Sequence, residues 1–272
     1  PLHGALSRQP HTVGMSVITP SPITRLITGA SSGIGLALVR YWLSQGSPVI
    51  AVARRASHCQ VLLQLQSEHL TGGPVLHIHD ADITDEQQLE DLATCLRTNN
   101  QIPDHIIQCA GMLHDPAQSL TPEKRLEDIS LKALQRSFAV NAFGPILLAR
   151  TLLPLLDSKR RTVFASLSAR VGSIQDNHLG GWYSYRASKA AQNQLLRTLA
   201  IETRRRLPNL TVLALHPGTT DTPLSQPYQR NVPEGKLFSA ERSAHQLAAI
   251  IDGAGENDHG RFVAWDGSDI PW

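Results

Sequence analysis

The chain has 272 residues, of which 41% are hydrophobic and 18% charged, and its formal net charge at pH 7 is +2. These values are typical of a globular protein that buries a large core in one domain, and the small net charge predicts no nucleic-acid partner. Cys59, Cys95 and Cys109 form no Cys-x-x-Cys pair, so we expect neither a disulfide framework nor a metal site. This cysteine usage indicates a reducing, cytoplasmic location.

The first segment, residues 1–22, contains several prolines with polar residues between them. It lacks the apolar core of a signal peptide, and we expect a flexible arm. A Met at position 15 predicts that part of residues 1–14 comes from a cloning sequence or a processed precursor. Residues 23–272 are then the folded domain. The chain has no run of about 18 consecutive apolar residues, so no membrane partner is expected.

Along residues 23–272, apolar and β-branched runs alternate with segments of helical spacing. Near-continuous apolar runs are typical of strands buried on both faces. Strands that alternate with helices indicate right-handed crossovers and a parallel sheet. We therefore predict an α/β protein, a single doubly wound domain with a seven-stranded parallel sheet flanked by helices. The predicted strands lie at residues 23–27, 48–53, 75–78, 105–109, 162–167, 210–215 and 262–265.

Two helices are predicted to be long, at residues 131–156 and 183–206. Pro145 and Pro154 are expected to interrupt the first of them. Prolines and a glycine break every long period in residues 219–237, which predicts a loop. A loop of that length within one domain is usually functional.

A glycine cluster, Thr28-Gly29-Ala30-Ser31-Ser32-Gly33-Ile34-Gly35, directly follows the first predicted strand and precedes a helical pattern. Glycines let the backbone turn tightly and approach a pyrophosphate, which the N–H groups and the dipole of a helix N-terminus bind. A helix entry turn alone would explain two of the glycines. At the first strand-to-helix junction of an alternating chain, however, the cluster predicts a dinucleotide cofactor site.

The second predicted strand ends at Ala53, and Arg54 and Arg55 follow it. NAD enzymes usually carry an acidic side chain here that binds the ribose 2′-hydroxyl, whereas arginines are suited to a 2′-phosphate. The pair predicts NADP(H), although two solvated surface arginines would give the same pattern. Asp82, after the third strand, is expected either to bind the adenine amine or to cap the next helix.

Tyr185 and Lys189 stand four residues apart in the second long helix, so their side chains share one face. A Tyr ordinarily loses its proton near pH 10 and needs a neighbouring cation to act near neutrality. At about 4 Å an attraction of ~4 kcal/mol would lower the pKa of Tyr185 by roughly three units. A half-buried Tyr with a Lys stem beside it would show the same spacing.

The glycine cluster, the Tyr-x-x-x-Lys pair and Pro217-Gly218 after the sixth strand resemble the short-chain dehydrogenase/reductase family over residues 23–272. Residues 168–186 are similar to the C-factor-like and sniffer-like carbonyl reductases of that family. The resemblance implies a Rossmann domain that binds NADP(H) and transfers a hydride between nicotinamide and a carbonyl or alcohol. It also implies that Tyr185 protonates the carbonyl oxygen, while Lys189 lowers its pKa and binds the nicotinamide ribose.

The same resemblance implies further site residues. Asn141 would hold a water that links Lys189 to solvent; a buried Asn bonded to backbone is a compatible alternative. Pro217-Gly218 and Thr220 or Thr222 would contact the nicotinamide carboxamide, although a plain turn also uses a Pro-Gly pair. The predicted catalytic set is Asn141, Ser168, Tyr185 and Lys189. The predicted cofactor-binding set is Thr28, Gly29, Ser31, Ser32, Gly33, Ile34, Gly35, Arg54, Arg55, Asp82, Ile83, Cys109, Ala110, Gly111, Tyr185, Lys189, Pro217, Gly218, Thr220 and Thr222.

The chain departs from the family pattern at two places. The family commonly has Asn-Asn-Ala-Gly after the fourth strand, where this chain has Gln108-Cys109-Ala110-Gly111; the last two residues preserve a close backbone approach, so cofactor binding is expected to survive. The usual catalytic serine is replaced by Ala169. Ser168 is the predicted substitute, although an extended backbone would point it to the opposite side. Ser173 is the second choice.

The sequence therefore predicts an NADP(H)-dependent reductase of aldehydes or ketones. The alternative is a C-factor-like signalling or regulatory protein that binds a dinucleotide and catalyses weakly. A nucleotide-sugar epimerase is a third hypothesis, which would require a longer C-terminal part. The substrate pocket is predicted to have apolar walls made by Trp182, Leu224, Tyr228 and Phe238.

A homodimer or homotetramer is expected, because family members commonly pair the two long helices. Leu195, Leu196 and Leu199 would supply part of the apolar interface. A stripe that faces the core of the monomer would explain the same residues.

Overall fold

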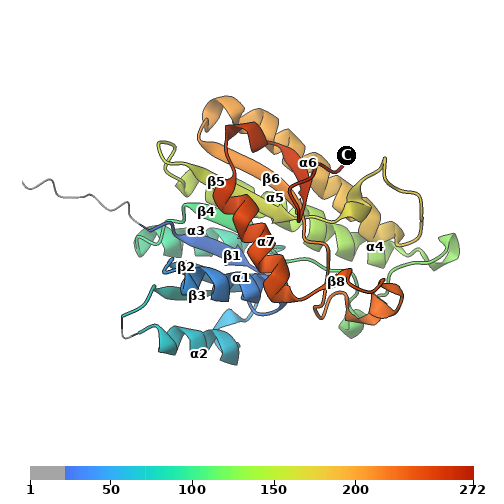
Figure 1. Cartoon of the computed structure of the whole chain (residues 1–272), viewed down its shortest axis with the longest axis horizontal. Coiled ribbons are helices and arrows are strands. Elements are labelled where there is room, and N and C mark those ends of the chain that lie inside the picture. The colour runs from blue at the N-terminus through green and yellow to red at the C-terminus, as the bar shows by residue number, and fades with distance from the viewer. Residues whose placement is uncertain (1–21, 71) are drawn as a thin grey trace, which may run out of the picture.

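The structure is a computed structural model that describes residues 22–70 and 72–272 (Figure 1). The predicted flexible arm, residues 1–22, therefore lies outside the described residues, except for Pro22.

One seven-stranded parallel sheet forms the centre of the molecule, with strand order β3-β2-β1-β4-β5-β6-β9. Each strand overlaps one of the seven predicted runs, so the predicted fold class is confirmed. The order reverses at β1, since β2 lies on one side of it and β4 on the other. Ligands of such sheets bind at this reversal, outside the carboxyl ends of the strands. The strands are β1 (Arg25–Thr28), β2 (Val49–Ala53), β3 (Leu76–Asp80), β4 (His105–Gln108), β5 (Thr162–Leu167), β6 (Leu210–His216) and β9 (Arg261–Ala264).

Helices cover both faces of the sheet (Figure 1). One core cluster joins α1, α2 and α7 to Ile27 and Ile107, and the other joins α3, α5 and α6 to Leu26 and Ile106. Neighbouring residues of one strand point into opposite cores, which is why the strands read as continuous apolar runs. The helices are α1 (Gly33–Ser44), α2 (Gln60–Glu68), α3 (Glu86–Thr98), α4 (Leu131–Phe138), α5 (Gly144–Leu152), α6 (Tyr183–Arg206) and α7 (Ala240–Gly253).

The first long helix is interrupted near both prolines, as predicted. A π turn at Ala139–Phe143 separates α4 from α5, and Pro145 lies inside the first turn of α5. A proline ring crowds the carbonyl four residues before it, here that of Asn141, and a wider π turn relieves the crowding. Pro154 lies in a 3₁₀ turn that ends the helix. The interruption thus places Asn141 at a distorted turn, as is frequent at functional sites.

The stretch Leu131–Leu155 is long and apolar enough to span a membrane by length and composition alone. In the fold, however, Leu148, Ala149 and Leu152 are completely buried in the core shared with α3 and α6. The α5 part of the stretch therefore belongs to the core of the domain.

The second long helix, α6, has the predicted bounds. Leu196 and Leu199 pack into the core of the monomer. The alternative of a core-facing stripe therefore holds for the buried Leu196, and Leu199 is partly buried against the same core, while oligomerisation stays a prediction.

The segment predicted as a loop contains two strands and a 3₁₀ helix. β7 (Thr219–Thr220) pairs in parallel with β8 (Leu237–Phe238), and a 3₁₀ helix at Gln226–Asn231 lies between them. The two ends of the segment are thus hydrogen-bonded to each other, which closes it into a compact loop.

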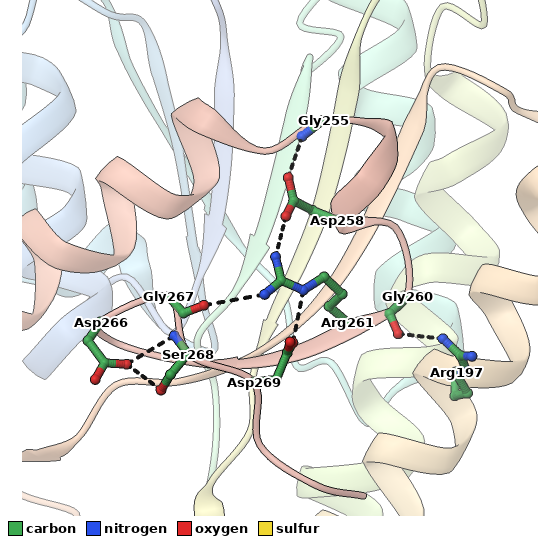
Figure 2. Close-up of polar contacts among 9 residues, drawn as sticks. All are labelled: Arg197, Gly255, Asp258, Gly260, Arg261, Asp266, Gly267, Ser268 and Asp269. Atoms are coloured by element: carbon green, nitrogen blue, oxygen red, sulfur yellow. Dashed lines mark hydrogen bonds and ion pairs between the residues drawn. The ribbon is translucent and has the colours of Figure 1, made fainter.

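The residues after β9 turn back along its free side. The N–H of Ile270 donates to Phe262 O and the N–H of Ala264 donates to Ser268 O, both at 2.8 Å. The guanidinium of Arg261 fixes this return by hydrogen bonds to Asp258, Gly267 and Asp269, as Figure 2 shows. We call residues 266–270 the return segment.

Candidate active site

One cavity of about 1580 Å³ opens at the carboxyl ends of the central strands. Every predicted cofactor-binding residue lines it, and so do three of the four predicted catalytic residues, Ser168, Tyr185 and Lys189. The fourth, Asn141, is completely buried behind the wall. Among the described residues no cluster of three His, Cys, Asp or Glu side chains is arranged to hold a metal ion.

The glycine cluster forms a tight backbone cradle between β1 and α1. Gly29 has a φ of +66°, and a Cβ added there would lie 2.8 Å from the backbone nitrogen of Ala110. Gly33 also has a positive φ, of +54°. At both positions a side chain would be strained, and at Gly29 it would also collide with the loop after β4. Glycine is therefore required by the geometry itself.

The N-terminus of α1 is left open toward the cavity. Its N-cap residue, Ser32, makes no side-chain hydrogen bond to the first turn, and that turn has no acidic residue. The Oγ1 of Thr28, at the end of β1, is buried and has no partner among the described residues. Free N–H donors at a helix N-terminus are suited to an anion. The cradle therefore fits the pyrophosphate of a dinucleotide.

Arg54 and Arg55 are exposed where β2 ends at the cavity. Within the part of the chain that the structure describes, neither is in an ion pair. Their guanidinium groups are thus available to a phosphate, which favours the NADP(H) interpretation over NAD(H). Arginines that are merely solvated would be exposed in the same way, so the contact of Arg54 and Arg55 with the cofactor stays a prediction.

Asp82 does not cap the following helix, which corrects one of its two predicted roles. Its Oδ1 accepts hydrogen bonds from the N–H and Oγ1 of Thr84, at 2.9 and 2.7 Å. The N-cap of α3 is Asp85, which accepts from the N–H of Gln88. Asp82 lines the cavity, and its contact with adenine stays a prediction.

Tyr185 and Lys189 lie together on the buried side of α6, with exposed fractions of 8% and 3%. The Nζ of Lys189 lies 5.9 Å from the centroid of the Tyr185 ring. Nζ donates to Leu167 O at 2.8 Å and to Gln192 Oε1 at 2.9 Å. The predicted pairing of phenol and ammonium on one face is present, but the ammonium is bonded to neutral oxygens of β5 and α6.

Burial governs the titration of both groups. It raises the pKa of the Tyr185 phenol above its ordinary value, and it lowers the pKa of the Lys189 ammonium to about 7. The expectation that Lys189 brings the pKa of Tyr185 near neutrality is therefore wrong for this structure. The physical reason is that desolvation disfavours both charged forms and exceeds their mutual attraction. Tyr185 consequently keeps its proton at neutral pH.

Asn141 clamps the backbone of the loop after β4. Its Oδ1 accepts from the N–H of Met112 at 2.8 Å, and its Nδ2 donates to Met112 O at 2.7 Å. The predicted backbone bonding is thus present. A Cβ added to Gly111 would lie 3.6 Å from Asn141 Oδ1 and 3.8 Å from Lys189 Nζ. Both side chains therefore face the same glycine, and the role of Asn141 in holding a water stays a prediction.

The two serines that were candidates for the missing hydroxyl have different environments. Ser168 lines the cavity, and its Oγ donates to Asn193 Oδ1 at 2.6 Å. Ala169 is extended, with φ −150° and ψ 146°, so successive side chains point to opposite sides. Ser173 is buried, does not line the cavity, and donates to Trp272 O at 3.4 Å while accepting from Asp176 N–H. Of the two, only Ser168 borders the cavity.

The Pro-Gly pair and the two threonines connect the segment after β6 to its neighbours. Gly218 has a φ of +79°, and an added Cβ would lie 2.5 Å from the Phe238 ring. Thr220 is buried and its Oγ1 is bonded to Ser243 Oγ. The side chain of Thr222 contacts Gly33 of the cradle, at 3.2 Å from an added Cβ. The glycine of the Pro-Gly pair is thus a backbone requirement, and contact with the carboxamide stays a prediction.

A row of aromatic rings extends from Tyr185 across the cavity wall. Ring centroids are 6.2 Å apart for Tyr185 and Trp182, 5.5 Å for Trp182 and Tyr228, and 5.9 Å for Tyr228 and His114. Trp182, Leu224 and Tyr228 line the cavity as predicted. Phe238 does not, because its ring packs on Trp265 under Arg242. His114 was not predicted, and no sequence signal marks it.

A buried carboxylate holds the row in place. Trp182 has the left-handed backbone conformation, with φ 54°, and its N–H donates to Glu123 O at 2.5 Å. The carboxylate of Glu123, itself buried, accepts hydrogen bonds from the N–H and Oγ of Ser184. Glu123 thus caps α6 from a segment 61 residues earlier in the chain, a contact that sequence spacing does not reveal.

Three arginines near the substrate end of the cavity are hydrogen-bonded within the protein. Arg136 bonds to Asp115 at 3.3 Å and Arg170 to Asp176 at 3.2 Å. Arg186 donates from Nε to the carbonyls of the two glycines before Trp182. This end of the cavity therefore offers aromatic and apolar surface, with two of the three arginines already paired with carboxylates.

Residues 24–233 match the family described as short chain dehydrogenase. A benzil reductase, (S)-benzoin forming, from Saccharomyces cerevisiae is 33% identical over 84% of this chain and 84% of its own length. The C-signal protein of Myxococcus xanthus is 31% identical over 54% of this chain and 83% of its own length.

Two solved structures share the fold. The NADPH-bound carbonyl reductase from chicken fatty liver has a TM-score of 0.79 and 26% identity, covering 92% of this chain and 100% of that one. Carbonyl reductase Sniffer of D. melanogaster has a TM-score of 0.79 and 25% identity with the same coverage. The predicted resemblance to C-factor-like and sniffer-like proteins is thereby confirmed.

Proposed function

We propose that this chain, which belongs to the short chain dehydrogenase family, reduces uncharged aromatic ketones or aldehydes with NADPH. The observation that carries the proposal is the meeting of two features in one cavity. An open helix N-terminus with a glycine cradle lies at one end, and the buried, protonated Tyr185 lies beside Lys189 at the other.

The cofactor end would hold NADP(H) through the chain's own groups. The cradle at Gly29 and Gly33 and the N-terminus of α1 suit the pyrophosphate, and Arg54 suits a 2′-phosphate. The solved relative from chicken liver is described as NADPH-bound. When bound, NADPH supplies the hydride.

The catalytic end supplies the proton. Because burial raises the pKa of Tyr185, its phenol is protonated at neutral pH and is ready to donate to a carbonyl oxygen that gains charge. Lys189 titrates near pH 7 and faces Gly111 together with Asn141. Lys189 is proposed to return a proton to Tyr185 after the phenol has donated its own. Ser168 is proposed to hold the carbonyl oxygen in place of the serine that Ala169 replaces.

The substrate class follows from the walls of the cavity. The rings of Trp182, Tyr228 and His114 continue directly from Tyr185, and aromatic rings prefer edge or offset contacts with one another. Arg136 and Arg170 are paired with Asp115 and Asp176, so these two side chains offer little free positive charge to an anionic substrate. A relative described as a benzil reductase agrees with an aryl carbonyl.

A second candidate function is a signalling or regulatory role with weak catalysis. Ala169 favours it, because the position of the usual catalytic hydroxyl carries none. The similarity to the C-signal protein points the same way. Intact Tyr185, Lys189 and Asn141 favour the reductase, since a protein that only binds a dinucleotide needs no proton donor.

Oxidation of NADPH, followed by absorbance with matched aryl and cyclohexyl ketones, tests the proposal. We expect turnover with both and a clear preference for the aryl member of each pair, with NADH less effective than NADPH. The absence of turnover with every carbonyl would contradict the reductase function and favour the second candidate. Equal rates for aryl and cyclohexyl ketones would contradict the substrate class alone.

Homo-oligomerisation and a cytoplasmic location are proposed as well. Leu131, Phe143, Tyr183 and Ile201, all within the two stretches predicted to pair, are exposed in the monomer. Light scattering at micromolar concentration tests this, and a strict monomer would contradict the oligomer. The free state of Cys59, Cys95 and Cys109 supports a reducing compartment.

A further inference from the structure

Behind Lys189 lies an uninterrupted chain of hydrogen bonds that runs through the sheet. Lys189 Nζ donates to Gln192 Oε1 at 2.9 Å, and Gln192 Nε2 donates to Ser166 Oγ at 2.7 Å. Ser166 Oγ donates to Gln108 Oε1 at 2.7 Å, and Gln108 Nε2 donates to Ala110 O at 2.5 Å. The chain thus starts at the ammonium and ends at the backbone of the loop after β4.

All the links have one direction. Each glutamine accepts at Oε1 and donates at Nε2, so every proton points from Lys189 toward Ala110. Gln192 Nε2 also donates to Leu167 O at 3.2 Å, the same carbonyl that accepts from Lys189. Reversing one amide would place two donors or two acceptors against each other. The orientation of Gln192 is therefore fixed by its neighbours on both sides.

These polar side chains occupy completely buried positions. Gln108, Ser166 and Gln192 each have an exposed fraction of 0%, and two of them lie on central strands of the sheet. A protein with apolar residues at such buried positions is often as stable as one with a polar network, or more stable. Packing alone therefore does not account for three polar side chains connected in one line to a buried ammonium.

The end of the chain lies at the cofactor cradle. Ala110, whose carbonyl accepts the last hydrogen bond, has its nitrogen 2.8 Å from the position of a Cβ on Gly29. A shift of this loop would therefore change both the shape of the cradle and the last hydrogen bond of the network. The network joins the loop that contacts the cradle to the ammonium beside Tyr185.

We propose that Gln192, Ser166 and Gln108 are positioning residues that hold Lys189 as an ammonium and connect it to the Cys109–Gly111 loop. The inference rests on the proposed function, in which Lys189 must be charged. The oxygen of Gln192 favours the ammonium over the neutral amine, against the burial of the site. Facing Lys189 are the titratable Tyr185 on α6 and, from the other contacting elements, the uncharged Leu167 carbonyl of β5, Asn141 and Gly111.

Two substitutions of Gln192 with opposite expected effects test the proposal. Gln192→Met removes the acceptor at similar side-chain length and so lowers the pKa of Lys189. The loss of activity that accompanies rising pH then begins at a lower pH. Gln192→Glu adds a negative charge, so the loss moves to higher pH. We expect displacements of about one pH unit in each direction in the profile of kcat/KM. Ser166→Ala breaks the next link and should displace the profile as Gln192→Met does, but less.

The matched control is Gln194→Met, an exposed glutamine on the same helix, which should leave the profile unchanged. A merely structural role of Gln192 would lower the melting temperature and scale activity equally at every pH, without opposite displacements. That outcome, or a profile identical to the wild type in both Gln192 variants, would overturn the inference.

NADPH binding, measured by fluorescence from pH 6 to 9, separates this inference from the proposed function. If the wild type reduces no carbonyl but Gln192→Met weakens NADPH binding about tenfold more at pH 8 than at pH 6, the reductase function fails and the inference stands. If the wild type is active and neither pH dependence moves in the variants, the inference fails alone. An absence of NADPH binding in the wild type would overturn both.

Discussion

The two ends of the cavity are built in different ways. At the cofactor end, the loops after β1 and β4 make the surface from backbone, and Gly29 must be a glycine for both its φ and its distance from Ala110. At the substrate end, the surface is made of side chains that reach across the fold, such as Trp182, Tyr228 and His114. The first construction depends on backbone conformation and close backbone approach, and the second on side-chain contacts between distant segments.

The two constructions constrain the sequence to different degrees. Few residue types can occupy the positions of a backbone cradle, whereas an aromatic wall can be built from many combinations of loops. Substitutions at the two ends should therefore separate cofactor binding from turnover, and four of them put that separation to the test.

The largest expected effect is at the substrate end. Tyr185→Phe removes the proton donor but keeps the ring that contacts Trp182, so turnover should fall about a thousandfold. NADPH affinity should change little. Stopped-flow absorbance and a fluorescence titration measure the two quantities, and a variant that keeps its turnover would remove Tyr185 from the mechanism.

Ser168→Ala should lower turnover about a hundredfold with NADPH affinity intact, as for one lost hydrogen-bond donor to a developing oxyanion. Ser173→Ala is the matched comparison, because Ser173 is buried away from the cavity and bonds to Asp176 and Trp272. Its effect should be milder and appear in stability. Steady-state kinetics that rank Ser173 above Ser168 would reverse the assignment of the hydroxyl.

At the cofactor end, Gly29→Ala should weaken NADPH binding about tenfold or more and destabilise the fold, because a left-handed residue costs about 1–2 kcal/mol and the new methyl group meets Ala110. Gly46→Ala is the control. Gly46 has a φ of +76° with nothing within 4 Å of an added Cβ, so it has the strain without the collision. Equal NADPH affinities in the two variants would show that the cradle tolerates a methyl group.

The smallest effect is expected from the surface arginine. Arg54→Ser together with Ala53→Asp should reduce the preference for NADPH over NADH about tenfold, since an exposed guanidinium contributes modestly. Dissociation constants for both cofactors measure it. If the preference is unchanged, Arg54 is a solvated surface residue and specificity lies elsewhere.

The sequence predicted what depends on local pattern. All seven strands of the sheet follow from apolar runs, and the cradle follows from Gly29 and its neighbours at a strand-to-helix junction. The choice between the two roles of Asp82 is also local: the cap is Asp85, three residues later. Either carboxylate suits the start of a helix, and only the helix boundary decides between them.

What the sequence missed depends on tertiary contact. Gln192 meets Ser166 from 26 residues away, and Glu123 meets Ser184 from 61. No spacing rule connects such positions. The expected pKa of Tyr185 failed for a related reason, because charge proximity can be read from a helix but burial cannot. Burial, which only the structure shows, has the larger effect on the pKa of Tyr185.

The return segment has a consequence for the solubility of the protein. β9 ends the sheet, and an open edge strand is a template onto which another chain can add a strand. Here residues 266–270 turn back along β9, with an antiparallel bridge between Val263 and Asp269, and Arg261 clamps them there (Figure 2). The chain thus shields its own edge from aggregation. Arg261→Ala should accordingly leave the cavity at the opposite end of the strand intact and instead make heated protein precipitate earlier.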